Sequence, residues 1–422
     1  MRRPLSAAGI PAGRSGPLWR RGDFRSFWTA QSTGILGGQV SQFTLPAAAI
    51  LLLQADAVAV GVVHALQTLP YLVLGLGVGV LADRTPRRRL IVLAGAGRVV
   101  VLAAVPLAAL LHLLTMEQLY VAAALNGAMA VVFTVACQAH LPDLVERPRL
   151  VEANARLQAS RSAVEVAAPA LSGAAIQWLG AADALLADAA AHAVSAAAAA
   201  RLPAPDRRLG SAQRAFLADL RQGVGAVLGH PVLRTVTAAS VVLNLGVSMA
   251  QTLLLLFAYR DLGLAPGAVG ALLALGSLGF AAGVAVTSPL SDRLGPGPAL
   301  ALSCLLIGLA LLLTPAAALG AAGPVLAATQ FLLSMQWPVY NAIQVTLRQQ
   351  VTPAELQGRV SATARTAAIG VMPFGAALAG LLGAHVGPAA TIGLAGLVAA
   401  AGALCLAAGG VARLRRLPSP PD

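Results

Sequence analysis

The chain has 422 residues, of which 58% are hydrophobic and only 11% are charged, and its formal net charge is +13. Soluble domains carry roughly 25% charged residues, so this sequence has too little polar material to cover a water-soluble globule. The arginines lie in short breaks between apolar runs, where they are typical of membrane topology signals, and we expect no nucleic-acid partner.

The residues that the chain lacks exclude several kinds of chemistry. All 29 basic residues are arginine, so the sequence offers neither a P-loop lysine nor a Schiff-base lysine. Cys137, Cys304 and Cys405 show no CxxC spacing, and no GxSxG or HExxH motif is present. We therefore expect no enzymatic activity, no metal site and no cofactor.

Apolar runs follow one another along the whole chain, each close to the ~20 residues that a spanning helix needs. They cover about 27–53, 58–81, 89–113, 117–139, 157–180, 184–201, 232–258, 266–290, 298–318, 322–347, 360–384 and 388–411. The sequence predicts an all-α membrane protein with twelve transmembrane helices.

The breaks between these runs alternate in charge. The even-numbered breaks carry the arginines, whereas the odd-numbered breaks carry only Arg260. By the positive-inside rule, this pattern places both termini in the cytoplasm. The predicted domains are a cytoplasmic N-terminal tail (1–26), a six-helix bundle (27–201), a cytoplasmic linker (202–231), a second six-helix bundle (232–411) and a cytoplasmic C-terminal tail (412–422). Part of the linker is mildly amphipathic, and we expect it to lie along the membrane surface.

A short charged turn occurs twice, after the second and the eighth predicted helices. The first copy includes Gly79, Asp83 and Arg84 and continues to Arg87 and Arg88, and a reduced copy lies 209 residues later. A repeat at half the chain length indicates gene duplication and predicts two pseudo-symmetric bundles.

The first copy of this turn resembles the loop between the second and third helices of the major facilitator superfamily. Pro86 stands where that loop usually has glycine, and in the second copy Gly295-Pro296-Gly297 replaces the basic residues. The resemblance implies a loop that latches the cytoplasmic side, with the first copy as the stronger latch, and Arg98 in the third run is placed to reach Asp83 and brace it. The predicted gating residues are Asp83, Arg84, Arg87, Arg88, Arg98, Asp292 and Arg293.

Shorter stretches resemble the bacterial drug and siderophore exporters of this superfamily, which include macrolide efflux proteins and enterobactin exporters. They are Asp23-Phe24-Arg25, Ala65-Leu66-Gln67, Leu141-Pro142-Asp143-Leu144-Val145, His230-Pro231-Val232-Leu233-Arg234 and Glu355-Leu356-Gln357-Gly358-Arg359-Val360. The resemblance implies a monomer in the bacterial inner membrane that exports an amphiphilic small molecule in exchange for protons. An importer of the same fold and a membrane scaffold or sensor without transport are the alternatives.

Ionisable residues inside apolar runs are functional candidates because burying their charge in a bilayer is costly. Members of the exporter branch often carry an acidic residue in the first helix, where this chain reads Leu36-Gly37-Gly38-Gln39. The remaining proton-coupling candidates are Glu165, four residues after Arg161, and the pair Asp188 and His192, which lie four residues apart. A structural ion pair is the alternative for Glu165, and helix packing or capping is the alternative for Asp188.

Uncharged polar residues gather on the first, seventh and tenth predicted helices, which line the central cavity in the superfamily. The predicted cavity residues are Gln31, Gln39, Gln42, Asn244, Gln251, Gln336, Trp337, Asn341 and Arg365. Hydrogen bonds between helices are the alternative for the amides, and snorkelling toward the cytoplasm is the alternative for Arg365.

Overall fold

The structure is a computed structural model that describes residues 18–74, 78, 81, 85–203 and 213–416. Most of the predicted gating loop, including Asp83 and Arg84, lies outside the described residues.

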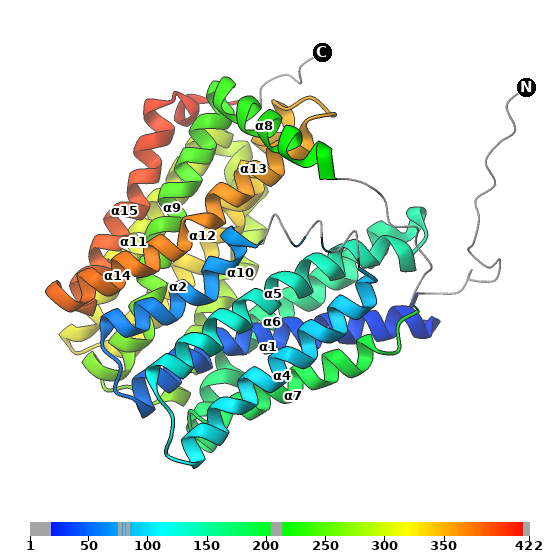
Figure 1. The fold of residues 1–422 in the computed structure, drawn as a ribbon. Helices are drawn as coiled ribbons and strands as arrows, with labels where there is room; N and C mark the ends of the chain where they lie inside the picture. Colours follow the sequence, from blue (N-terminus) through cyan, green and yellow to red (C-terminus); the bar gives the residue numbers. More distant parts are fainter. Residues whose placement is uncertain (1–17, 75–77, 79–80, 82–84, 204–212, 417–422) are drawn as a thin grey trace, which may run out of the picture.

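The described part of the chain is helical, and its helices fall into two sets separated by a linker (Figure 1). The first set is α1 (Gly22–Leu52), α2 (Ala57–Val73), α4 (Arg87–Leu110), α5 (Met116–Leu144), α6 (Leu150–Leu179) and α7 (Ala184–Ala199). The linker contains α8 (Gln213–Gly229). The second set is α9 (Pro231–Leu256), α10 (Pro266–Leu294), α11 (Pro296–Leu313), α12 (Ala322–Gln350), α13 (Gln357–Gly370), α14 (Met372–Val386) and α15 (Pro388–Ala408). Because α13 and α14 together form one broken span, each set supplies six spans, as the sequence predicted.

Short helical segments join or flank these spans. They are the 3-10 helices η1 (Leu18–Arg20), η2 (Arg147–Arg149), η4 (Thr314–Leu319) and η5 (Val411–Arg413), and the π-helix η3 (Phe257–Asp261) that ends the seventh span. Two of the described spans begin at a residue whose side chain caps the helix. Asp56 accepts a hydrogen bond from the backbone of Ala59 at the start of α2, and Thr115 forms a capping box with Gln118 at the start of α5.

Among the described residues, eight spans are long and apolar enough to cross a membrane by length and composition alone, and α2 and α7 are shorter apolar helices. The two remaining spans, α6 and α12, are 30 and 29 residues long but carry more polar side chains. Both contribute polar side chains to the cavity described below, among them Glu165 of α6 and Gln330 of α12.

The two halves repeat the same pattern of helix packing. In the N-terminal half the main contacts are α1–α7, α4–α7, α4–α5, α2–α5 and α1–α6. Their counterparts in the C-terminal half are α9–α15, α11–α15, α11–α12, α10–α12 and α9–α14. This one-to-one correspondence confirms the predicted pair of pseudo-symmetric bundles.

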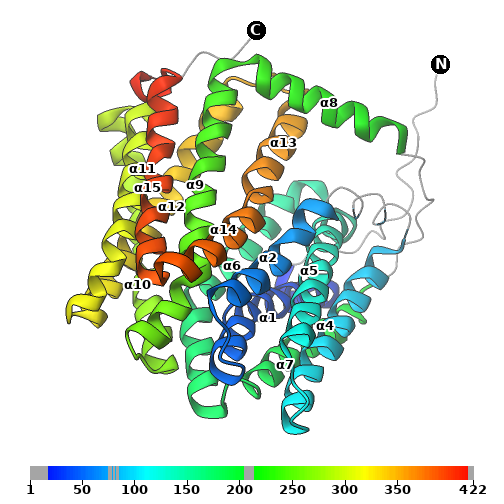
Figure 2. The same ribbon diagram turned by 60° about the vertical axis from the view of Figure 1, so that its left-hand side comes forward.

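The halves meet along two helix crossings that are related by the same pseudo-symmetry, α2 with α14 and α6 with α10. Both crossings are closest near the end of the molecule where α1 and α9 finish, which we call the closed end. At the opposite end, which carries α8, the two halves diverge (Figures 1 and 2). We call this the open end.

Glycine allows the backbones to touch at both crossings. A Cβ on Gly61 would lie 2.8 Å from the Cα of Gly380, and a Cβ on Gly173 would lie 2.6 Å from the Cα of Gly270. Small residues are the usual means by which spanning helices approach closely.

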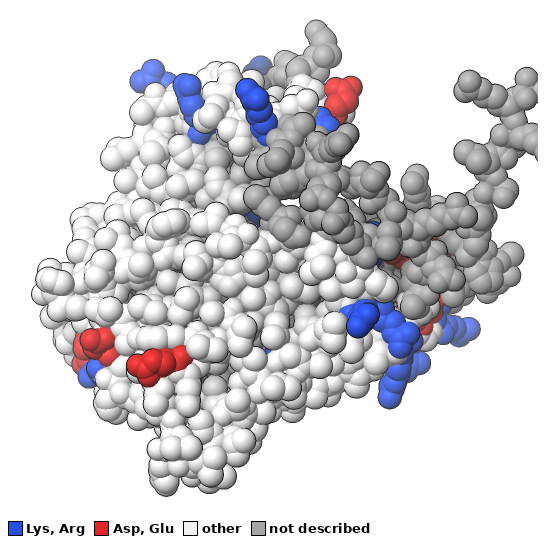
Figure 3. All heavy atoms as spheres, in the orientation of Figure 1, with Lys and Arg blue, Asp and Glu red and all other residues white. Residues whose placement is uncertain are grey.

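Charged side chains lie near the two ends, and the face drawn in Figure 3 shows a broad uncharged band between them. Large apolar side chains are exposed along the spans, for example Val100, Leu110, Trp178 and Leu404. Exposed apolar side chains along the spans, with charges near the two ends, indicate a surface in contact with lipid.

Candidate functional site

A cavity of about 490 Å³ lies between the two halves. Its walls come from α1, α2 and α6 of the N-terminal half and from α9, α10, α12, α13 and α14 of the C-terminal half. The predicted cavity residues that line it are Gln39, Gln42, Asn244, Gln251 and Trp337. The structure thus brings together side chains that lie up to about 300 positions apart in the sequence.

The other predicted cavity residues lie outside the lining of this cavity. Gln336 is 2% exposed, and its Oε1 atom is buried without a hydrogen-bond partner. Asn341 donates to the backbone oxygen of Trp337, one turn earlier on α12. Gln31 is half-buried on α1, and Arg365 is exposed on α13.

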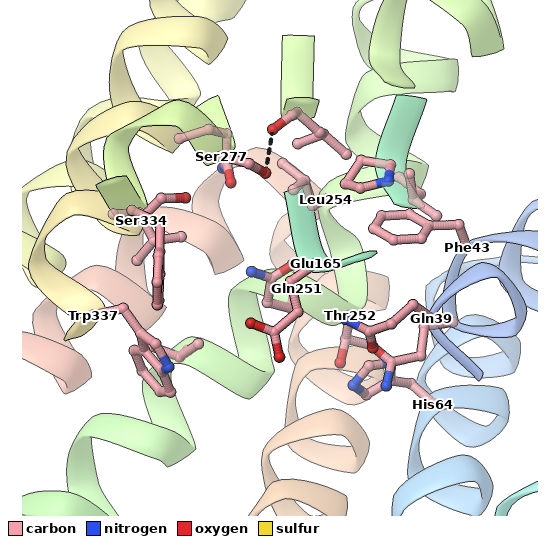
Figure 4. A pocket seen from close by; sticks show the side chains of 18 of the residues that line it. Gln39, Phe43, His64, Glu165, Gln251, Thr252, Leu254, Ser277, Ser334 and Trp337 are labelled. Carbon is pink, nitrogen blue, oxygen red and sulfur yellow. Dashed lines mark hydrogen bonds between the residues drawn. The ribbon is translucent and has the colours of Figure 1, made fainter. Parts of the chain in front are cut away.

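Sequence reasoning missed several lining residues. His64 of α2 lies in the cavity wall beside Gln39 and Thr252 (Figure 4). Its Nε2 atom is buried without a hydrogen-bond partner. The missed aromatic residues are Phe43 and Phe280, and the missed hydroxyls include Ser162, Ser277 and Ser334. A single polar or aromatic residue in an apolar run gives no sequence signal for the direction in which it points.

Glu165 supplies a carboxylate to the cavity wall and lies next to Gln251 in the close-up (Figure 4). Its Oε1 atom accepts a hydrogen bond from Nε of Arg161 at 3.0 Å. The side chains of Arg161 and Glu165 are 49% and 36% exposed, so this ion pair faces an open space between the halves. The geometry makes Glu165 available to a ligand, which would compete with Arg161 for the carboxylate.

Asp188 and His192, the other predicted proton-coupling pair, are fully enclosed within the N-terminal half. Each residue is 1% exposed, and His192 Nε2 lies 3.3 Å from Asp188 Oδ1. The second carboxylate oxygen of Asp188 accepts a hydrogen bond from the hydroxyl of Ser41 on α1. The pair does not line the cavity between the halves.

Arg98 lies in the middle of α4, where it is 2% exposed. Its Nε atom donates to Asn126 Oδ1 of α5 at 2.7 Å, and its guanidinium group faces Gly38 of α1. The structure therefore gives Arg98 partners inside the bundle. The sequence also predicted a contact between Arg98 and Asp83, but Asp83 lies outside the described residues.

The arginines that follow the gating loop bind the ends of neighbouring helices at the open end. Arg87 donates to Asp143 Oδ2 at 2.6 Å and to the backbone oxygen of Ala139 on α5. Arg88 donates to the backbone oxygen of Ala200, which follows α7. These contacts tie the start of α4 to two other helices of the same half.

The second copy of the turn is built differently. Asp292 and Arg293 are exposed in the last turn of α10. Gly295, at φ +91°, and Gly297 make room for the C-terminal segment, and Gly297 donates its backbone N–H to the oxygen of Leu414 at 2.9 Å. The glycines that replace the basic residues of the first copy therefore form a docking place for residues 411–415.

Polar contacts also join the halves at the closed end. Gln177 of α6 accepts a hydrogen bond from the backbone of Gly267 on α10 at 3.3 Å. Arg260, in the π-helix η3, approaches Gln54 Oε1 at 3.5 Å. Within the described ranges, no group of three or more His, Cys, Asp or Glu side chains is placed to hold a metal ion.

The pseudo-symmetric bundles and the cavity between them agree with the sequence comparison. Residues 27–370 match the family described as Major Facilitator Superfamily. The chain belongs to this superfamily. No curated protein sequence matches the chain significantly.

Solved structures of other superfamily transporters share the fold. The nucleoside transporter NupG has a TM-score of 0.71 at 11% identity, and the match covers 92% of this chain and 98% of NupG. A bacterial homologue of the iron transporter ferroportin in an inward-facing state has a TM-score of 0.66 at 18% identity, covering 92% and 100% of the two chains. A bacterial homologue of the human lysosomal transporter Spinster, in an inward-facing and occupied conformation, has a TM-score of 0.69 at 13% identity, covering 94% and 96%.

At these identities the similarity establishes the fold of a multi-pass transporter of the major facilitator superfamily. The cavity lies between the two halves of this fold.

Proposed function

We propose that the protein is a secondary active transporter that exports an amphiphilic small molecule from a bacterial cell in exchange for protons. The observation that carries this proposal is the cavity between the halves. It is lined by both bundles, closed at one end by the two glycine crossings and bordered at the other by helices that diverge. This arrangement is typical of a carrier in a conformation that is open to one side of the membrane.

The chemistry of the lining supports an amphiphilic substrate. Phe43, Phe280, Trp337 and several aliphatic side chains provide apolar contact area, whereas Gln39, Gln42, Asn244 and Gln251 provide amide donors and acceptors. Sites that are mostly apolar with a few convergent polar groups are typical of small-molecule binding. Glu165 adds a carboxylate that would attract a positively charged group.

The distribution of arginine supports an inward-open orientation. Among the described loops at the closed end, arginine occurs only at Arg260, whereas the open end carries many, including Arg87, Arg149, Arg201 and Arg293. By the positive-inside rule the open end is cytoplasmic, which also places both termini in the cytoplasm. The cavity is then open to the cytoplasm, the compartment from which an exporter takes its substrate.

We assign the transport unit to a monomer in the bacterial inner membrane, because the cavity is complete within one chain. Residues 27–201 and 232–411 form its two moving bundles, residues 202–231 link them, and residues 1–26 and 412–422 are cytoplasmic tails. The order of motifs that resemble the macrolide and enterobactin exporters supports export over import.

Transport of ethidium, a fluorescent organic cation, into everted membrane vesicles tests the proposal. An exporter coupled to protons accumulates ethidium in vesicles with an acidic interior and loses this activity when nigericin collapses the pH gradient. Accumulation in right-side-out vesicles with an acidic exterior would instead show an importer. Absence of flux for ethidium and for a panel of neutral and anionic amphiphiles, with correctly folded protein, would indicate a scaffold or sensor.

A further inference from the structure

A second cluster of ionisable side chains lies inside the N-terminal half, apart from the cavity. We propose that Asp188 and His192 of α7, together with Arg98 of α4, form the proton site of this transporter. In this proposal, Gly37 and Gly38 of α1 leave the space that the three side chains occupy. The proposal rests on the proposed function, since it assigns the residues that couple export to protons.

The cluster is enclosed on every side. Asp188 and His192 are each 1% exposed and Arg98 is 2% exposed. Asp188 Oδ1 and His192 Nε2 face each other at 3.3 Å, yet neither atom has a hydrogen bond of good geometry. The buried carboxylate and the buried imidazole each have an atom without a hydrogen-bond partner. A proton between these two atoms would supply the missing hydrogen bond.

The glycine pair in α1 creates the space for these side chains. A Cβ on Gly37 would lie 2.6 Å from His192 Nε2 and 2.9 Å from Asp188 Oδ1. A Cβ on Gly38 would lie 3.3 Å from a terminal nitrogen of Arg98. The carboxylate of Asp188 thus reaches α1 from α7.

The helices around the cluster contribute few other ionisable groups. In α1 these occur only in the first turn, at Asp23 and Arg25, whereas Ser41 of α1 binds Asp188 directly. From α2, Gln67 donates to the backbone oxygen of Ser41 at 3.1 Å, and His64 lines the cavity.

The other two neighbouring helices add no charge to the cluster. From α5, the neutral Asn126 accepts from Arg98, and His140 lies farther along the helix against Phe27. From α6, Glu165 faces the cavity (Figure 4).

The charge balance of the cluster explains how a proton would drive a conformational change. With a neutral imidazole, the carboxylate of Asp188 compensates the guanidinium of Arg98. An additional proton, bound either to Asp188 or to His192, leaves one excess positive charge within a bundle closed to water. Charged groups at this depth cost on the order of 3 kcal/mol, so the proton is retained only in a conformation that differs from this one. The inward-open state should therefore release the proton, as an exporter requires.

One helix connects this cluster with the substrate cavity. In α1, Gly37, Gly38 and Ser41 face the cluster, whereas Gln39 and Gln42 line the cavity. A shift of α1 caused by a proton on one side changes the cavity wall on the other. Coupling between proton binding and substrate binding requires a structural element whose position both sites influence, and α1 is such an element.

The test measures the response of the conformation to pH without any substrate. Nitroxide labels at Val151 of α6 and Gln349 of α12, both exposed at the open end, are introduced in a background in which the three cysteines are replaced by serine or alanine. Pulsed electron resonance then gives the distance between the halves from pH 5.5 to 8.5. We expect the distance to shorten at low pH in the parent protein.

The variants separate the cluster from the cavity. Asp188→Asn should abolish the pH response, whereas Glu165→Gln and the matched control Asp183→Asn, an exposed acid at the start of the same helix, should retain it. Asp188→Asn leaves the positive charge of Arg98 without its counter-charge, which could disturb the fold. The double variant Asp188→Asn/Arg98→Gln removes both charges and should also abolish the pH response.

A pH response that persists in both Asp188 variants, that disappears in Glu165→Gln, or that is missing in the parent protein would overturn the proposal. Ethidium export in vesicles is measured in parallel. If export occurs but the cluster variants leave the pH response unchanged, only the proton site is wrong. If no amphiphile is transported, the proposed function is wrong.

Discussion

Gly173 and Gly270 touch across the two halves with their backbones, and a Cβ on either one would come within 2.7 Å of the Cα of the other. Gly61 and Gly380 form the equivalent contact on the pseudo-symmetric side. These two crossings hold the closed end shut, and a side chain at any of the four positions separates the helices.

Replacing Gly270 by leucine should therefore prevent closure at this end and abolish ethidium transport. Leucine has a better helix propensity than glycine by roughly 1 kcal/mol, so a loss of transport would not reflect a weaker helix. The measurement is the distance between spin labels across the closed end, which should increase. Gly323→Ala is the control, because the nearest atom to a Cβ at Gly323 is 4.0 Å away. An unchanged distance in Gly270→Leu would contradict the prediction.

Replacing Glu165 by glutamine should weaken the binding of cationic substrates selectively. A carboxylate in a water-accessible cavity attracts a cation by about 1.4 kcal/mol, between the values for bulk water and for a protein surface, which corresponds to a tenfold change in affinity. We expect the apparent KM for ethidium to rise about tenfold, with little change for a neutral amphiphile that the protein transports. Equal effects on both substrates would argue against a direct contact with the cation.

Replacing Asp143 by asparagine should destabilise the N-terminal half. The carboxylate is 10% exposed and Arg87, its partner at 2.6 Å, is 16% exposed, so the loss should be about 2 kcal/mol, in the range for a hydrogen bond to a charged group. Thermal unfolding in detergent would show the change as a lower Tm. Glu152→Gln, which removes the exposed ion pair with Arg156, should lower stability by no more than about 0.5 kcal/mol.

Replacing Gly297 by alanine should release the C-terminal segment. A Cβ there would lie 2.0 Å from the backbone oxygen of Val411, so η5 has to move away from α11. Limited trypsin digestion should then cleave after Arg413 and Arg415 faster than in the parent protein, because local opening exposes these sites. The matched control is Gly225→Ala, where no atom lies within 4 Å of the added Cβ. Unchanged cleavage would show that the segment is held elsewhere.

The sequence was sufficient for the fold because the bilayer imposes the length and polarity of each span. It was less informative about the cavity, since neighbouring residues on a helix point about 100° apart. Gln336 and Trp337 show this difference, because only the tryptophan lines the cavity. The partners of Arg98 and Asp188 depend on how α1, α4 and α7 assemble, and Ser41 and Asp188 are 147 positions apart. Nothing in the local sequence of either helix indicates that contact.

The linker helix α8 packs against α13 and α9, and Gly223 lies against the backbone of Arg359 and the side chain of Thr363. It therefore belongs to the C-terminal half and travels with it as a rigid attachment. A cut in the chain between residues 203 and 213 would break no contact between described residues. The two pieces, produced as separate polypeptides in one cell, would then have to assemble through the non-covalent contacts between the halves, chiefly the two glycine crossings. Transport by the reassembled pieces would show that the covalent link is dispensable.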